Sequence, residues 1–160
     1  MTDTSCRKEI QKVQLHKVEC AQAPAALGPY SQAVCVSLPG AQMLFLSGQL
    51  PIDPSTGKLI ATDIRSATRC TLDNLEAILQ EAGCTWEQVV RVEIFLKDLN
   101  EFPEMNEEYR LRFRSSCLPA RQTIQVAKLP LDAPLEISCI AILPEVQKFP
   151  LKGGQLLKNG

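Results

Sequence analysis

Two charged side chains stand inside segments that are otherwise typical of apolar strands. Arg121 follows a Pro-Ala step and begins the segment 121–127, and Glu136 is the single charge in the run 135–142. A charge in such surroundings is costly unless it is paired or binds something of opposite charge. The planar fork of an arginine fits a carboxylate or a phosphate with two hydrogen bonds. The two residues therefore predict a site that holds a small anion beside a carboxylate, and a structural Arg–Glu ion pair is the alternative.

Size and composition are those of one ordinary globular domain. The chain has 160 residues, of which 45% are hydrophobic and 22% charged, and its formal net charge is −1. Such a balance creates no overall field that would attract nucleic acid or an anionic membrane. No apolar run approaches the roughly 20 residues that cross a bilayer, and residues 1–10 lack the apolar core of a secretory signal. We expect a cytoplasmic protein with no membrane partner.

The cysteines point to reduced thiols rather than to disulfides or metal. No two of them form a C-x-x-C pair, and the single histidine, His16, has no partner at zinc-site spacing. Several lie inside apolar runs, where cysteine behaves as a small hydrophobe. We therefore expect free cysteines, no metal site and no Cys–His nucleophile. The seven cysteines are Cys6, Cys20, Cys35, Cys70, Cys84, Cys117 and Cys139.

Hydrophobic periodicity and turn residues give the expected elements. One helix is predicted from residue 63 to 82, with Thr62 as its N-cap and Gly83 just past its end. A second is predicted over 102–113, and a short helical turn over 85–88. The segment 50–58 is dense in turn formers and predicts a surface loop. The strands are predicted at 13–20, 33–38, 42–47, 89–96, 121–127 and 135–142.

This order of elements predicts an α+β fold with one sheet. A six-stranded sheet with both helices on one face buries both apolar helix stripes. The other face of the sheet must also be covered, and self-association is the economical way to cover it in a chain of this size. We expect an N-terminal extension at 1–13, a domain at 14–143 and a C-terminal tail at 144–160.

Five short segments together resemble one known family. Their order and spacing are similar to those of the RidA/YjgF/YER057c/UK114 family over roughly residues 14–142. Each string is weak by itself, and the joint pattern is strong. The segments are Ala25-Ala-Leu-Gly-Pro-Tyr-Ser-Gln32, Leu46-Ser-Gly-Gln-Leu-Pro51, Val92-Glu-Ile-Phe-Leu-Lys-Asp-Leu-Asn100, Leu118-Pro-Ala-Arg-Gln122 and Leu135-Glu-Ile137.

The resemblance implies a fold, an assembly and an activity. The fold is a chorismate-mutase-like domain with a six-stranded mixed sheet, and the assembly is a homotrimer with ligand clefts between subunits. Well-studied members of the family hydrolyse reactive enamine or imine intermediates, notably 2-iminobutanoate and 2-iminopropanoate, to 2-oxo acids and ammonia. They use no metal or organic cofactor, so we expect none here. The expected partners are a small 2-imino acid and two further copies of the chain.

The resemblance also implies roles for particular residues. Arg121 would bind the substrate carboxylate, and Glu136 would position or activate the attacking water. These residue types suit the chemistry, because imine hydrolysis needs a placed water and proton transfers rather than a strong nucleophile. Tyr30, Ser47 and Asn106 each have a structural alternative: a closed loop, a strand-end turn and a solvated helix position, respectively. The residues expected to line the cleft are Tyr30, Ser47, Gly48 and Asn106.

Two other functions stay open from the sequence. Some relatives are described as endoribonucleases or translation inhibitors, and Arg110-Leu-Arg-Phe-Arg114 places three arginines around an aromatic residue. On a helix this pattern favours a solvated face or an oligomer contact, so nucleic acid is not an expected partner. The third hypothesis is a small-ligand-binding or chaperone-like module that uses the same cleft without turnover.

Overall fold

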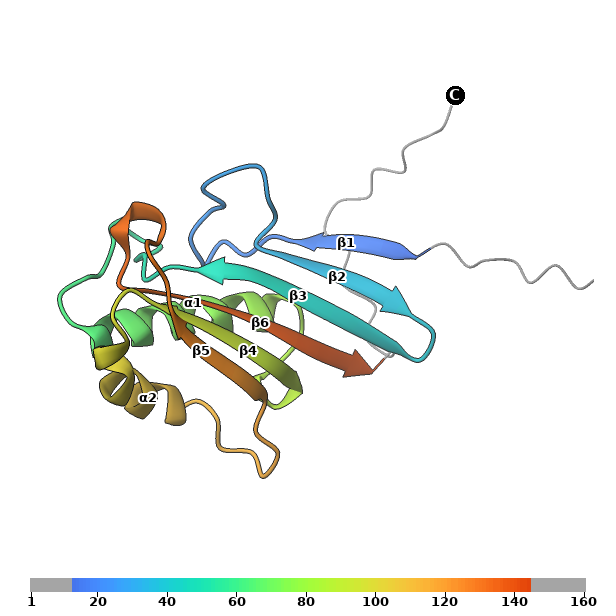
Figure 1. Cartoon of the computed structure of the whole chain (residues 1–160). Coiled ribbons are helices and arrows are strands. Elements are labelled where there is room, and N and C mark those ends of the chain that lie inside the picture. Colours follow the sequence, from blue (N-terminus) through green and yellow to red (C-terminus); the bar gives the residue numbers. More distant parts are fainter. Residues whose placement is uncertain (1–12, 145–160) are drawn as a thin grey trace, which may run out of the picture.

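The computed structural model describes residues 13–144, which form one six-stranded mixed sheet with two helices on one face (Figure 1). The strand order is β1-β2-β3-β6-β4-β5, and every neighbouring pair is antiparallel except the parallel pair β4–β5. The strands are β1 (Gln14–Val18), β2 (Ala33–Leu38), β3 (Ala41–Gln49), β4 (Val89–Leu96), β5 (Ala120–Gln125) and β6 (Leu135–Pro144), and the helices are α1 (Ile64–Glu81) and α2 (Phe102–Arg110).

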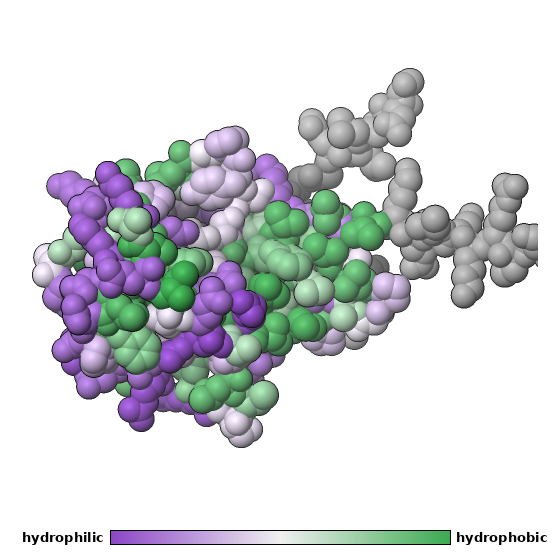
Figure 2. Space-filling view, in the orientation of Figure 1, coloured by the Kyte–Doolittle hydropathy of each residue, from purple (hydrophilic) through white to green (hydrophobic). Residues whose placement is uncertain are grey.

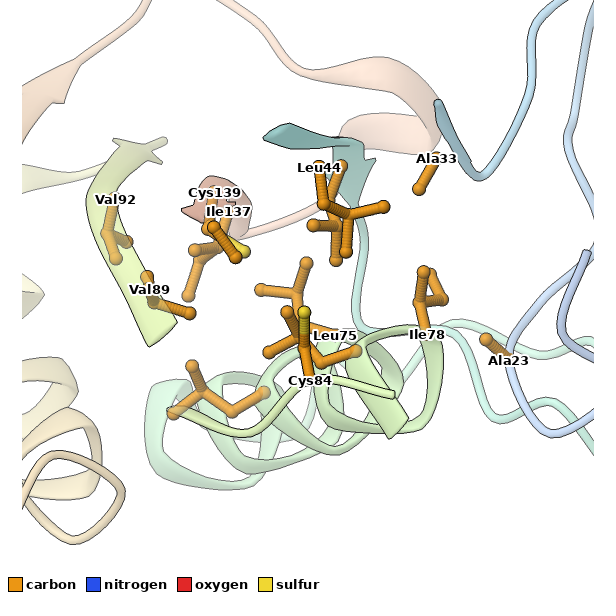
Figure 3. Close-up of a cluster of buried hydrophobic side chains, with 14 of the residues drawn as sticks. Ala23, Ala33, Leu44, Leu75, Ile78, Cys84, Val89, Val92, Ile137 and Cys139 are labelled. Carbon is orange, nitrogen blue, oxygen red and sulfur yellow. The ribbon is translucent and has the colours of Figure 1, made fainter. Parts of the chain in front are cut away.

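The main core lies between the sheet and α1 (Figure 3). Leucine and isoleucine side chains of the helix meet alternate residues of the strands, as expected for an amphipathic helix on a half-buried sheet. The hydroxyls of Thr68 and Thr71 are buried in this layer, and each donates to a carbonyl one turn earlier in α1. The fully buried side chains include Leu44, Leu72, Leu75, Ile78, Leu79, Ile94 and Ile137.

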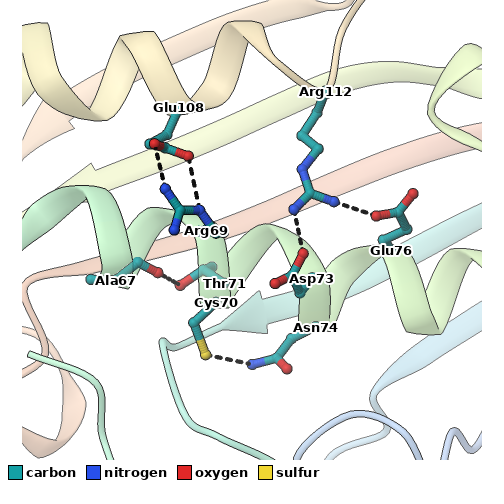
Figure 4. A network of polar contacts seen from close by, with 9 residues as sticks. All are labelled: Ala67, Arg69, Cys70, Thr71, Asp73, Asn74, Glu76, Glu108 and Arg112. Carbon is teal, nitrogen blue, oxygen red and sulfur yellow. Dashed lines mark hydrogen bonds and ion pairs between the residues drawn. The ribbon is translucent and has the colours of Figure 1, made fainter.

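Ion pairs fix α2 against α1 (Figure 4). Arg69 of α1 donates two hydrogen bonds to the buried carboxylate of Glu108. Arg112, just beyond α2, reaches back to both Asp73 and Glu76 of α1. A bidentate Arg–carboxylate pair constrains orientation as well as distance. These contacts therefore set the position of α2, which carries one of the predicted site residues.

The face of the sheet that no helix covers carries a contiguous apolar surface over β2, β3 and β6 in the single chain (Figure 2). Phe45 and Ile142 project from it with 40% and 42% of their surfaces exposed. Contiguous exposed apolar surface of this kind marks an interaction site. The neighbouring side chains on this face are those of Leu15, Val34, Val36, Met43 and Ile140.

Three local predictions were wrong. Asp63, not Thr62, caps α1, and its carboxylate accepts the backbone N–H of Ser66 at 2.8 Å. The second helix ends at Arg110 rather than at residue 113, because the chain turns there. The segment 50–58 does not lie wholly on the surface. Its first residues are buried in a small second cluster made of Leu50, Ile52, Leu129 and Ala133.

The structure bears on the predicted thiols and membrane segments, whereas the predicted terminal segments lie mostly outside the described residues. The proposed extension and tail lie almost wholly in residues 1–12 and 145–160, outside the described residues. All six cysteines within 13–144 are free. Among the residues described, no helix has both the length and the apolar character needed to cross a bilayer.

Candidate functional site

Arg121 lies on the outermost strand, β5, with its side chain on the helix-covered face of the sheet. Its register partner in β4 is Val92, which is buried in the core below the helices. The guanidinium Nη1 donates to Oδ1 of Asn106 on α2 at 2.8 Å. The guanidinium carbon also lies 4.5 Å from the ring centroid of Tyr109 and 5.7 Å from that of Phe102. Within the described part of the chain, the hydrogen bond and both ring contacts that orient this cation come from α2.

The expectation that Arg121 sits in an apolar, desolvated strand is wrong for the single chain. Five of the six residues of β5 are exposed, Arg121 among them, because β5 pairs only with β4 and forms an edge. Within residues 13–144 its one hydrogen-bond partner is the Asn106 amide oxygen. A guanidinium has five N–H donors. Most of its donor capacity therefore remains available to an incoming anion.

Glu136 lies on β6, half-buried against the backbone of Gly48. A Cβ atom added to Gly48 would stand 2.7 Å from the carboxyl carbon of Glu136 and 2.9 Å from its Cγ, so only glycine leaves room for this carboxylate. The β3–β6 pairing shifts register between Leu46 and Gln49, which places Ser47 and Gly48 in an irregular segment beside it. Burial raises the pKa of Glu136 above its ordinary value.

Ser47, the neighbour of Gly48 in β3, is hydrogen-bonded to the loop that precedes β2, and Tyr30 lies in that loop. The Ser47 hydroxyl donates to the carbonyl of Ser31 at 2.7 Å, and the Ser47 N–H donates to the carbonyl of Gln32. The Tyr30 hydroxyl accepts the N–H of Leu27 at 3.0 Å, while 46% of the residue's surface remains exposed. Both side chains therefore serve the local structure of the loop. Tyr30 in addition remains partly accessible to solvent.

Gln32 and two aromatic residues are contributions to the site region that the sequence analysis missed. The buried Gln32 amide accepts from the N–H of Cys20 and donates to the carbonyl of Pro24, which anchors the Tyr30 loop. Phe102 and Tyr109 flank the guanidinium from α2. Helical spacing held a signal for the aromatic pair, because both lie within one turn of Asn106.

The predicted site residues fall into two groups on opposite faces of the sheet. Arg121 pairs in register with Val92, and Glu136 pairs with Phe95. Val92 and Phe95 are three residues apart on one strand, so their side chains project to opposite faces. A structural ion pair between Arg121 and Glu136 within one chain is therefore excluded. No pocket within a single chain can therefore contain both side chains.

These features define a class of protein. It is a small α+β subunit in which an accessible, oriented guanidinium and a half-buried carboxyl lie on opposite faces of one sheet, with the carboxyl on the apolar face. The family model described as "Endoribonuclease L-PSP" matches residues 20–143. The chain belongs to this family, the RidA/YjgF family.

Known proteins show how far the likeness extends. The human 2-iminobutanoate/2-iminopropanoate deaminase is 40% identical over 125 residues, which are 78% of this chain and 88% of the human protein. The structure of the YjgF gene product from E. coli matches this chain with a TM-score of 0.72 and 38% sequence identity. The match covers 79% of this chain and 98% of the E. coli chain. E. coli TdcF with bound serine has the same score and identity, with 80% and 98% covered.

Proposed function

We propose that this protein hydrolyses 2-imino acids, such as 2-iminobutanoate and 2-iminopropanoate, to 2-oxo acids and ammonia. The observation that carries the proposal is the accessible guanidinium of Arg121, which is held by Asn106 and two aromatic rings with most of its donors available. Such a group recognises a small planar carboxylate through two parallel hydrogen bonds. The half-buried carboxyl of Glu136 supplies the acid–base function.

The reaction needs only proton transfers around one water. Arg121 binds the substrate carboxylate, and Glu136 accepts a proton from a water as its oxygen attacks the imine carbon. Glu136 then returns the proton to the nitrogen of the resulting carbinolamine. Glu136 next transfers the proton of the carbinolamine hydroxyl to the same nitrogen, so the C–N bond breaks, the oxygen becomes the new carbonyl, and ammonia leaves. Burial raises the pKa of this carboxyl, so it accepts a proton from water more readily than an ordinary glutamate does and can then return it.

The site in this proposal is shared between copies of the chain. Arg121 and Asn106 come from one protomer, and Tyr30, Ser47, Gly48 and Glu136 come from its neighbour in a homotrimer. The opposite faces of Arg121 and Glu136 support this division, since one chain cannot bring them together. Phe45 and Ile142 lie on the same face of the sheet as Glu136 and are partly exposed. Their exposure supports burial of this face against another copy of the chain.

The comparisons supply independent support. The human relative is named for deamination of 2-iminobutanoate and 2-iminopropanoate. E. coli TdcF was solved with serine bound, and serine carries an α-carboxylate next to a nitrogen-bearing carbon, as a 2-imino acid does.

The direct test is hydrolysis of 2-iminobutanoate generated in place by an amino acid oxidase or a threonine dehydratase. We expect the purified protein to accelerate release of 2-oxobutanoate over buffer by a factor proportional to its concentration. A rate equal to that of buffer would reject the deaminase. Saturable binding of 2-oxobutanoate by such an inactive protein would favour the small-ligand-binding module instead.

The pH dependence of kcat follows from Glu136. Burial raises the pKa of this carboxyl, so its ionised, proton-accepting form is lost at a higher pH than for an ordinary glutamic acid. Activity that needs the carboxylate is present above the raised pKa and disappears as the pH falls through it. We expect the acid limb of kcat to lie above about pH 4.3, the ordinary value for Glu. A limb at or below that value would contradict the assigned role.

The endoribonuclease alternative takes its support from the family model's description. The basic segment 110–114 gives this alternative little support. Its central arginine, Arg112, forms ion pairs with Asp73 and Glu76 and is less exposed than Arg110 and Arg114. Arg110 and Arg114 remain exposed. An RNA binder would show affinity that falls steeply with salt. RNA binding that is absent at low salt would dispose of this alternative.

A further inference from the structure

A buried aromatic ring lies directly beneath the guanidinium of Arg121. Tyr109 is only 6% exposed, and the guanidinium carbon stands 4.5 Å from its ring centroid. This is well within the roughly 6 Å at which a cation is attracted by the face of an aromatic ring. Phe102 lies farther away, at 5.7 Å. Tyr109 is thus the closer of the two rings and the one fixed in the core.

Tyr109 is itself held by a row of rings. It stacks on Phe113 with centroids 4.4 Å apart and an interplanar angle of 26°. Phe113 in turn meets Trp86 edge-on, with centroids 5.0 Å apart. Such packed aromatic pairs resist rotation because their rings fill the space between them. The surface that Tyr109 offers to Arg121 is therefore rigid, although Arg121 stands on an exposed edge strand.

The ring face, and not the hydroxyl, makes this contact. The Tyr109 hydroxyl oxygen is buried and has no hydrogen-bond partner among the described residues. Burial raises the pKa of Tyr109 to about 12, although the nearby Arg121 acts in the opposite direction, so the phenol stays neutral at physiological pH. A phenylalanine at this position would keep the surface beneath the guanidinium, and an aliphatic residue would remove it.

We propose that Tyr109 is a positioning residue for the anion-binding guanidinium of Arg121. Asn106 fixes one nitrogen of the guanidinium through its hydrogen bond, and the Tyr109 ring fixes the plane. Together they direct the remaining donors toward the substrate carboxylate before the substrate arrives. A long arginine side chain loses rotamer freedom when it binds a ligand, and preorganisation reduces that loss. This inference rests on the proposed function for the identity of the anion.

The test compares Tyr109→Phe with Tyr109→Leu. We expect Tyr109→Leu to weaken binding of 2-oxobutanoate, the stable product anion, by about five- to twentyfold and to raise KM similarly, with kcat changed less than KM. Tyr109→Phe should stay within about twofold of the wild-type protein. Met105→Ala is the matched stability control, because Met105 is fully buried in the core on the same helix. It should lower the melting temperature and leave the affinity unchanged.

A second measurement does not depend on the ligand. The proton resonance of the Arg121 Nε–H, assigned through its loss in Arg121→Ala, senses the ring beneath the guanidinium. It should be similar in the wild-type protein and Tyr109→Phe and should move in Tyr109→Leu. An unmoved resonance in Tyr109→Leu, or a Tyr109→Phe variant as impaired as Tyr109→Leu, would overturn the proposal. An inactive wild-type protein that still shows the expected pattern would reject only the deaminase function.

Discussion

Replacing Arg121 by alanine is expected to lower kcat/KM for 2-iminobutanoate by about 10²- to 10³-fold. Removal of one partner from a hydrogen-bonded charge pair costs on the order of 2–5 kcal/mol, and each 1.36 kcal/mol corresponds to a factor of ten. The loss should appear first in KM and in the affinity for 2-oxobutanoate, because the guanidinium holds the carboxylate of both substrate and product. Arg121→Lys should recover only a small part, since a point charge cannot form the two parallel hydrogen bonds.

The matched control is Arg110→Ala. Arg110 is an exposed arginine at the last turn of α2, so its removal changes the net charge equally. It contributes to neither half of the proposed site, and we expect wild-type kinetics. Equal losses in the two variants would show that overall charge matters rather than the oriented guanidinium. An active Arg121→Ala protein would remove the basis of the proposed substrate class.

The second large effect is expected from one methyl group at Gly48. In Gly48→Ala the new Cβ would collide with the carboxyl group and the Cγ of Glu136, so the carboxylate must leave its position. A displacement of about 1 Å in a reacting group can cost about a hundredfold in rate. We therefore expect kcat to fall by about that factor while the affinity for 2-oxobutanoate falls much less, because in the proposed shared site the carboxylate-binding Arg121 belongs to the neighbouring protomer.

A double-variant cycle separates this effect from general damage to the fold. If Gly48→Ala acts through Glu136, it should add almost nothing to the loss already caused by Glu136→Gln. A loss of kcat in the double variant equal to the product of the two single losses would indicate an independent cause, such as a disturbed β3–β6 pairing. Thermal melts of the four proteins, including wild type, would show whether that pairing is affected.

The sequence was sufficient for the order and type of the elements. Alternating apolar residues located the strands, including the two predicted at 33–38 and 42–47 that pair as β2 and β3. The errors came from local competition. Thr62 and Asp63 are both good caps, and only the bond to Ser66 decides between them. Phe113 continues the apolar spacing of α2 although the helix has ended, because it packs on Tyr109 from the following turn.

The sequence indicated candidate site residues by their types, and it gave no information on their geometry. Arg121 and Glu136 are 15 positions apart, and the sequence carries no sign that their side chains project to opposite faces. Their orientation depends on the register of β4 with β5 and β6, which pairs Val92 with Arg121 and Phe95 with Glu136. Exposure of Arg121 likewise depends on β5 being an edge strand, which periodicity does not reveal.

The central claim is that one site takes Arg121 from one protomer and Glu136 from another, and mixing two inactive variants tests it directly. Arg121→Ala and Glu136→Gln chains, unfolded and refolded together in equal amounts, would combine at random in each assembly. About one quarter of the interfaces would then contain both intact side chains, so about one quarter of wild-type activity should return. Mixed assemblies with no more activity than either variant alone would contradict the shared site.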